Sequence, residues 1–175
     1  GKSNQALSRY LVKEGARITC FDKKTRDELG DAYSRLASLG VQWSLGEGYL
    51  EPLPSFPHIF LTPGIKKNLP EIARARANGA RISGEIALFL ERCKAKVAAV
   101  TGSAGKTTTA TLAGLMLRES GLGVPVYVGG NIGSVLIEQV DEIRPDALVV
   151  LEVSSFQLET VTKSPHFALI LNEKP

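Results

Sequence analysis

The stretch Thr101-Gly-Ser-Ala-Gly-Lys-Thr-Thr108 decides how this chain folds, and it directly follows the apolar run Lys96-Val-Ala-Ala-Val100. The order is a short buried strand, a turn with two glycines, a lysine with hydroxyl residues, and then a helical pattern. In such a turn the backbone N–H groups point at phosphate oxygens, and the new helix presents its positive end to them. The sequence therefore predicts a binding site for a nucleoside triphosphate.

Each position of this turn has an expected role. The ammonium of Lys106 reaches the β and γ phosphates, and the hydroxyl of Thr107 can ligate Mg²⁺. The general P-loop pattern has glycine at position 100, which is Val here, so the run is a shortened variant. The alternative is a glycine-rich turn with a solvated lysine, which leaves the poorly helix-forming threonines unexplained. The expected phosphate-binding residues are Gly102, Ser103, Ala104, Gly105, Lys106, Thr107 and Thr108.

Composition narrows the class of protein. The 175 residues suffice for one large domain or two small ones, and 43% hydrophobic content is ordinary for a soluble α/β protein. The net charge of +3 is scattered, so we expect a phosphorylated small molecule as partner and no nucleic acid. Cys20 and Cys93 lie in apolar patterns and are expected to be buried thiols in the cytoplasm. No apolar run is long enough for membrane insertion; the oligomeric state is not predicted.

Strands and helices alternate along the chain, which predicts mostly parallel, doubly wound sheets. In the first part we expect strands at 17–22, 41–44, 58–62 and 81–83, and helices around 7–14, 29–40, 70–78 and 86–93. In the second part we expect strands at 96–100, 124–128, 147–152 and 167–171, and helices at about 107–120 and 134–141. A domain boundary near 92–96 gives domains of residues 1–93 and 94–175. The chain opens in a helical pattern and stops just after a strand, so we expect a piece of a longer protein.

Polar residues at other strand ends are candidates for the same site. Glu152 ends the apolar strand 147–152, and an acidic residue in that position of a phosphate-binding fold holds Mg²⁺; a solvated strand-end carboxylate is the alternative. Asn131 stands between glycines after another strand, where it can bond a ligand. Ser154 and Gln157 follow Glu152 and suit a polar substrate, or else form an ordinary capped turn.

The first part of the chain has its own candidate residues. Asp22 ends a strand 21 residues after Gly1, the spacing at which an acid contacts the nucleoside in dinucleotide-binding βαβ units. Thr62-Pro63-Gly64 closes another parallel strand, at the sheet edge where open α/β sheets bind ligands.

Three runs in this order resemble the Mur ligases of peptidoglycan synthesis. The loop 101–108 is close to the family pattern T-G-[ST]-N-G-K-[ST]-T, and Gly129–Gly133 is similar to G-G-N-I-G. The run 151–159 resembles L-E-[LV]-S-S-F-Q-L-E, the form found in members that add D-glutamate. Thr62–Ile65 and Ser83–Phe89 also resemble the family's first domain, so the resemblance covers nearly the whole chain.

The resemblance implies a fold and an activity. The expected fold is a Rossmann-like domain for the uridine-diphosphate substrate, followed by part of a P-loop-type ATP-binding domain. The implied enzyme uses ATP and Mg²⁺ to join D-glutamate to UDP-N-acetylmuramoyl-L-alanine through an acyl phosphate, for cell-wall synthesis and hence cell shape and division. Lys106 and Glu152 would be catalytic, with Thr107 and Glu152 as metal ligands. The implied substrate-binding residues are Gly1, Lys2, Ser3, Asp22, Lys23, Thr62, Pro63, Gly64, Asn131, Ser154 and Gln157.

The chain also departs from the family pattern. Ala104 stands where the family has asparagine, although the backbone cradle should survive this change. Leu171-Asn172 begins the family's L-N-x-x-x-D-H-L-D segment, but Glu173-Lys-Pro175 ends the chain before its histidine. By the resemblance, the first strand and the C-terminal amino-acid-binding domain are also absent. A sister Mur ligase, a folylpolyglutamate-type ligase and a nucleotide-binding module without ligase activity remain as alternatives.

Overall fold

The computed structural model describes residues 1–131 and 133–172. Ile132 of the run 129–133 and the terminal residues 173–175 lie outside the described residues. The chain divides into two compact units, Gly1–Ser83 and Gly84–Pro175. The sequence placed the boundary later, after residue 93. Helix α5 (Glu85–Arg92) belongs to the second unit because it packs against η2 (Leu136–Gln139) and α7 (Ser155–Leu158). The division of function between domains stays a prediction.

The first unit contains four strands in two parallel pairs. β1 (Thr19–Asp22) pairs with β2 (Gln42–Leu45), and β3 (His58–Phe60) pairs with β4 (Arg81–Ser83). The predicted α/β class with parallel strands is confirmed, but these pairs are two separate sheets and not one doubly wound sheet. The difference arises because β1 bonds only to β2 and β3 only to β4, and among the described residues no ladder joins the two pairs. The helical segments are α1 (Lys2–Lys13), α2 (Arg26–Leu29), α3 (Asp31–Ala37), η1 (Leu53–Ser55) and α4 (Pro70–Ala77).

Apolar side chains connect the two sheets of the first unit. A buried cluster of Leu53, Ile59, Leu61, Ile72 and Ala75 lies between η1, β3 and α4. Phe21 of β1 packs against this cluster, and its ring meets the edge of Phe56 at a centroid distance of 5.2 Å and an interplanar angle of 89°. Such edge-to-face pairs add roughly 0.5–1.5 kcal/mol beyond the burial of apolar area. Apolar packing therefore holds these two sheets together, although within the described part of the chain no backbone hydrogen bonds pair their strands with each other.

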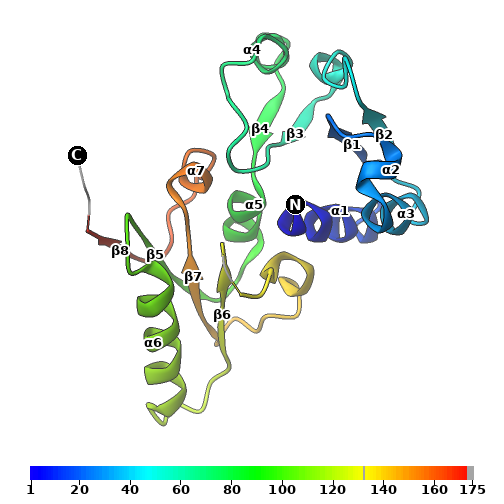
Figure 1. Cartoon of the computed structure of the whole chain (residues 1–175). Coiled ribbons are helices and arrows are strands. Elements are labelled where there is room, and N and C mark those ends of the chain that lie inside the picture. Colours follow the sequence, from blue (N-terminus) through cyan, green and yellow to red (C-terminus); the bar gives the residue numbers. More distant parts are fainter. Residues whose placement is uncertain (132, 173–175) are drawn as a thin grey trace. The chain divides into compact units, whose positions relative to one another are not determined.

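The second unit is built on a four-stranded parallel sheet in the order β6-β7-β5-β8 (Figure 1). Its strands are β5 (Lys96–Gly102), β6 (Val126–Gly130), β7 (Leu148–Glu152) and β8 (Phe167–Leu171). The register pairs Glu152 with both Val100 and Gly130. The carboxyl ends of the three strands therefore lie together, at the edge where parallel α/β sheets bind ligands.

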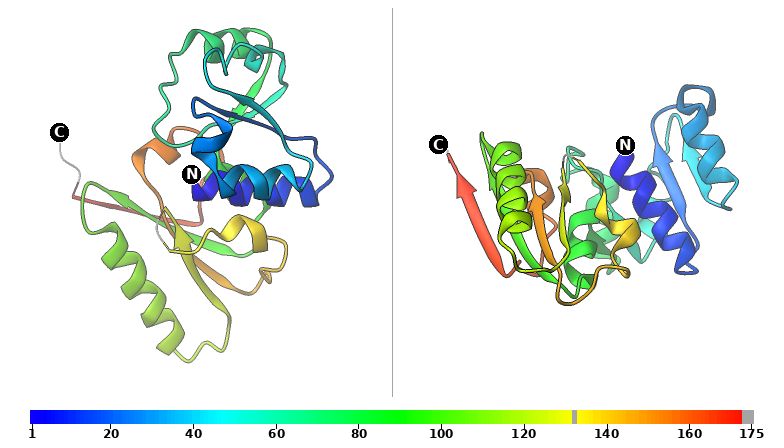
Figure 2. Two further views of the ribbon diagram at one scale, coloured as in Figure 1. Left: turned by 45° about the vertical axis from the view of Figure 1, so that its right-hand side comes forward. Right: turned by 90° about the horizontal axis from the view of Figure 1, so that it is seen from below.

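Helix α6 (Lys106–Glu119) lies along one face of this sheet (Figures 1 and 2). Val100, Ala110 and Val150 form its buried contact with the strands. Successive strand residues point to opposite faces, so Val149 and Leu151, which are 1% and 0% exposed, are covered on the other face. Both faces of the sheet are thus covered at β7, as expected for parallel strands.

Two predicted elements of the second unit differ in the structure. The helix expected over 134–141 is a short 3₁₀ turn, η2, and the residues after it form turns. The helical turn α7, which the sequence left as a possible capped turn, forms at 155–158. Within the described residues no helix combines the length and the apolar character needed to cross a membrane.

Glu85, at the start of α5, is a carboxylate buried outside the predicted site. It is 6% exposed, and among the described residues no group donates a hydrogen bond to its Oε2. Burial raises the pKa of Glu85 from 4.5 to about 7, because the charged form loses its hydration. The folded chain therefore holds this proton more tightly than the unfolded chain.

We expect the Glu85→Gln variant to remove a pH dependence of stability. Because the pKa of Glu85 is higher in the folded state, this carboxyl lowers the free energy of unfolding as the pH rises from 4.5 to about 7. Above that pH the loss is constant. Glutamine keeps the shape without the charge, so the variant should gain up to about 3 kcal/mol over the parent above pH 7. Thermal unfolding between pH 5 and 8 measures this difference. Exposed Glu142→Gln is the control, and parallel profiles for parent and Glu85→Gln would contradict the prediction.

Candidate nucleotide-phosphate site

The predicted phosphate loop runs from the end of β5 to the start of α6. Gly102 ends the strand, and Gly105 forms the N-cap of the helix in a left-handed conformation, with φ 82°. At Gly102 the backbone of β8 lies so close that an added Cβ would stand 1.8 Å from the carbonyl oxygen of Leu171. Glycine is therefore required at this position, where the loop leaves the sheet.

The loop gathers positive groups at the carboxyl end of β5. The N–H groups of Lys106, Thr107 and Thr108 open helix α6 and have no acceptor within the helix, so they are available to an anion. The ammonium of Lys106 folds back over the loop and donates to the carbonyl oxygen of Gly102 at 2.6 Å. A phosphate bound in the loop would replace that carbonyl as the acceptor.

One backbone donor of the loop, that of Ser103, is bonded within the protein, and the binding of phosphate by Ser103 stays a prediction. Its backbone N–H donates to the carbonyl oxygen of Leu171 in β8 at 3.2 Å, so this donor is already used inside the protein. The sequence could not show this, because the strand that supplies the acceptor lies far along the chain. In the structure the donors open to a phosphate belong to the later residues of the loop.

Glu152 lies beside the loop, as the sequence predicted. It is buried, with 3% of its surface exposed, and its Oε2 accepts a hydrogen bond from the hydroxyl of Thr107 at 2.8 Å. Its Oε1 accepts from the side-chain amide of Asn131 at 3.4 Å, and the backbone N–H of Asn131 donates to the Glu152 carbonyl at 2.8 Å. Thr107 of α6, Glu152 of β7 and Asn131, which directly follows β6, thus form one polar cluster at the end of the sheet.

The close approach of β6 to β7 depends on the glycine run before Asn131. A Cβ added at Gly130 would lie 2.2 Å from the carbonyl oxygen of Glu152. The glycines thus allow Asn131 to reach Glu152, which is the kind of close backbone approach that the sequence suggested. Asn131 contacts the carboxylate here, and its expected contact with a substrate stays a prediction.

The pair Thr107 and Glu152 is suited to Mg²⁺. This ion prefers oxygen ligands, needs one or two carboxylates or hydroxyls from the protein, and keeps several waters. The Thr107 hydroxyl donates a hydrogen bond to Glu152, so the lone pairs of the hydroxyl oxygen remain free for a cation. Among the described residues no group of three or more histidine, cysteine or acidic side chains gathers as a metal cage. Thr107 and Glu152 are the residues of this cluster that could hold such an ion, and this role stays a prediction.

Ser154 and Gln157 form a reciprocal capping box at the start of α7. Gln157 Oε1 accepts hydrogen bonds from the backbone N–H of Ser154 at 2.8 Å and from its hydroxyl at 3.0 Å. The Ser154 hydroxyl in turn accepts from the Gln157 N–H at 3.3 Å. The capped turn that the sequence offered as an alternative is therefore present, and a role of these residues in substrate binding stays a prediction.

In the first unit, the predicted residue Thr62, which follows β3, contacts the first turn of helix α1 through Asn4. The side-chain amide of Asn4 donates to the Thr62 hydroxyl at 2.9 Å. Asn4 follows Gly1, the N-cap, within the first turn of α1, where free N–H groups favour an anion. Asn4, which directly follows Gly1-Lys2-Ser3, was not among the predicted residues. The other predicted residues of this unit are half-buried at Ser3 and Asp22 and exposed at Gly1, Lys2, Lys23, Pro63 and Gly64.

Asp22 is tied into the turn after β1. Its Oδ1 accepts from the backbone N–H of Lys24 at 3.0 Å, and its carbonyl accepts from Gly46 N–H at 3.1 Å. Asp22 therefore sits at the carboxyl end of β1, as predicted, while contact with a nucleoside stays a prediction.

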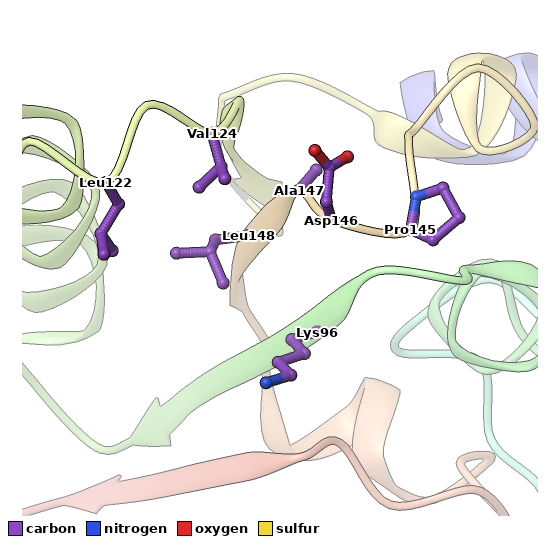
Figure 3. A pocket seen from close by; sticks show the side chains of 7 residues that line it. All are labelled: Lys96, Leu122, Val124, Pro145, Asp146, Ala147 and Leu148. Carbon is purple, nitrogen blue, oxygen red and sulfur yellow. The ribbon is translucent and has the colours of Figure 1, made fainter.

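A hollow of about 250 Å³ lies at the opposite end of the second unit's sheet (Figure 3). Lys96 and Leu148, the first residues of β5 and β7, line it together with Leu122 and Val124. The carboxylate of Asp146 at its rim is bound by the guanidinium of Arg144 at 2.6 and 2.9 Å. This mostly apolar hollow lies at the amino ends of the strands, away from the phosphate loop.

The comparisons with known proteins agree with the resemblance found in the sequence. The chain is 57% identical over 175 residues to the UDP-N-acetylmuramoylalanine--D-glutamate ligase of Symbiobacterium thermophilum. It is 46% identical over 175 residues to the ligases of the same name from Clostridium botulinum and Ruminiclostridium cellulolyticum. All of this chain is matched, and it spans 37–38% of the length of these relatives.

No protein-family model matches the chain. Among solved structures, the murein peptide ligase of Psychrobacter arcticus aligns with 86% of this chain and 36% of its own, at 19% identity and a TM-score of 0.46.

Proposed function

We infer that this chain, which matches ligases of the Mur family over its whole length, is part of an ATP-dependent ligase of peptidoglycan precursor synthesis. The reaction would join D-glutamate to UDP-N-acetylmuramoyl-L-alanine. The observation that carries the proposal is the contact between Thr107 and Glu152 beside the loop 101–108. This contact places the buried carboxylate of Glu152 beside the N-terminus of α6, where Lys106 also lies.

In the proposed reaction, the substrate carboxylate attacks the γ phosphorus of ATP, the bond to the bridging oxygen breaks, and ADP leaves. The amine of D-glutamate then attacks the acyl phosphate carbonyl, phosphate leaves, and the amine loses a proton. Lys106 and the first N–H groups of α6 would hold the phosphates and stabilise the charge on them. Thr107 and Glu152 would hold Mg²⁺, which neutralises charge on the β and γ phosphates when bound.

Each unit carries its own proposed substrate-binding residues. Gly1, Lys2, Ser3 and Thr62 would bind the diphosphate at the start of α1, which the Asn4–Thr62 hydrogen bond supports. Asp22 and Lys23 would contact the uridine side, with Pro63 and Gly64 shaping the turn. Asn131, Ser154 and Gln157 would orient the muramoyl-alanine end. We also propose a cytoplasmic location, which the free thiols of Cys20 and Cys93 support.

We expect Glu152→Gln in the full-length protein to weaken the use of Mg²⁺. Glutamine keeps the volume and an acceptor for Thr107 but removes the charge that a divalent cation needs, so the Mg²⁺ concentration for half-maximal activity should rise about 10–100-fold. Activity is measured against Mg²⁺ concentration at saturating ATP, with exposed Glu119→Gln as the control. Thermal unfolding verifies that both variants fold. An unchanged Mg²⁺ requirement in a folded Glu152→Gln variant would overturn the assignment.

A further inference from the structure

The end of β8 holds the phosphate loop by two consecutive residues. The carbonyl oxygen of Leu171 accepts the N–H of Ser103 at 3.2 Å, and the side-chain amide of Asn172 donates to the carbonyl oxygen of Ala104 at 3.2 Å. Leu171 also pairs with Gly102 in the ladder of β5 and β8. Three successive residues of the loop are therefore fixed by Leu171, the last residue of β8, and by Asn172 after it, neither of which belongs to the predicted site.

The contact of Asn172 determines the direction of one peptide group of the loop. A trans peptide is planar, and its C=O and N–H point in opposite directions. Because the Ala104 carbonyl points toward Asn172, the N–H of Gly105 points away from Asn172. Gly105 is the N-cap of α6, so this N–H adds to the free donors of the first helical turn. Rotation of this peptide would replace a donor with a carbonyl oxygen, which repels phosphate.

The backbone of Asn172 fits this role. It has φ 47°, in the left-handed region, where asparagine is tolerated much better than most residues with a side chain. Its amide is a donor, and the acceptor is a backbone oxygen, so the contact does not depend on which side chain position 104 carries. Asparagine therefore combines a permitted turn conformation with a donor aimed at the loop.

We propose that Asn172 is a positioning residue that orients the Ala104–Gly105 peptide so that the loop binds the phosphates of ATP. This rests on the proposed function of the loop as a nucleotide site. Asn172 acts through the loop backbone and itself touches no phosphate. Its loss should therefore weaken nucleotide binding without removing a reacting group.

Two substitutions separate the parts of this role. Asn172→Gly keeps the left-handed backbone and loses the amide, while Asn172→Asp keeps the size but places a carboxylate against the Ala104 oxygen. Asn78→Gly is the matched control, because the Asn78 amide likewise donates to a backbone carbonyl, that of Pro54 at 3.0 Å, in the other unit.

The test measures ATP binding by calorimetry and steady-state kinetics in the full-length protein. We expect the Kd and KM for ATP to rise roughly 5-fold in Asn172→Gly, the loss of one hydrogen bond, and more in Asn172→Asp. The kcat at saturating ATP should fall much less, and Asn78→Gly should leave Kd and KM for ATP unchanged. Should Asn172→Asp fail to fold, Asn172→Gly still decides.

The ATP affinities of the unsubstituted protein and of Asn172→Gly distinguish a failure of the Asn172 role from a failure of the nucleotide site. If the unsubstituted protein binds ATP and Asn172→Gly binds it equally well, the positioning role is wrong while the nucleotide site stands. If the unsubstituted protein binds no ATP, the proposed function of the loop fails, and the role of Asn172 fails with it.

Discussion

Replacing Lys106 with alanine in the full-length enzyme is expected to lower kcat about 10²–10³-fold, the loss seen when one charge-stabilising donor is removed from a transition state. The ammonium of Lys106 lies over the loop, 2.6 Å from the Gly102 carbonyl, so a small movement brings it to a bound phosphate. In the transition state, charge spreads over the equatorial oxygens of the transferred phosphoryl group and develops on the leaving oxygen, where an ammonium can stabilise it. The effect should therefore appear mainly in kcat, with a smaller rise in the KM for ATP.

Lys96→Ala is the matched control for this experiment. Lys96 begins the same strand, β5, at the end far from the loop, and its side chain is exposed. Its loss removes the same charge and should leave kcat within about twofold, since surface changes away from special features have small effects. A Lys106→Ala enzyme that keeps most of its kcat would contradict the phosphate role of the lysine.

Gly102→Ala is expected to cause the largest loss of stability, at least about 3 kcal/mol. The added methyl group would lie 1.8 Å from the Leu171 carbonyl oxygen, and 2.7 and 2.8 Å from the carbonyl carbon and nitrogen of the same residue. These are backbone atoms of a paired strand and cannot rotate away as a side chain would. The ladder between β5 and β8 must open, which also releases the loop contacts of Ser103 and Ala104.

Gly123→Ala separates steric clash from backbone strain. Gly123 also has a positive φ, 68°, but an added Cβ there meets no atom within 4 Å. Its substitution should cost only the strain of a left-handed alanine, roughly 1–2 kcal/mol. Urea or thermal unfolding of the two variants measures the difference, and equal losses would show that the contact with β8 is unimportant.

Local patterns of the sequence were sufficient for much of the second unit. The strand, the glycine turn and the helix of residues 96–120 are contiguous, so periodicity and turn residues predicted them. Glu152 was found because phosphate-loop folds place an acidic residue at the end of a neighbouring strand, and its approach to Thr107 follows from the alignment of parallel strand ends. Ala104 contributes its backbone oxygen, which explains why a departure from the family pattern there leaves the loop intact.

Features that depend on distant parts of the chain were not predictable in this way. The N–H of Ser103 donates to Leu171, and Asn172 donates to the Ala104 carbonyl, because β8 returns beside β5 after the intervening residues 103–166. The two sheets of the first unit were predicted as one, because periodicity identifies strands but not their hydrogen-bonding neighbours. The segment 134–141 contains a short 3₁₀ turn, η2, in place of the expected helix, and Leu136 and Ile137 are buried in that turn.

The most direct test of the central claim is release of phosphate from ATP by the full-length protein, with each substrate omitted in turn. The account predicts steady release that requires ATP, Mg²⁺, UDP-N-acetylmuramoyl-L-alanine and D-glutamate together, with one amide product formed for each phosphate. Phosphate release that is the same without D-glutamate and the muramoyl substrate would instead identify a nucleotide-binding module without ligase chemistry, and would contradict the account.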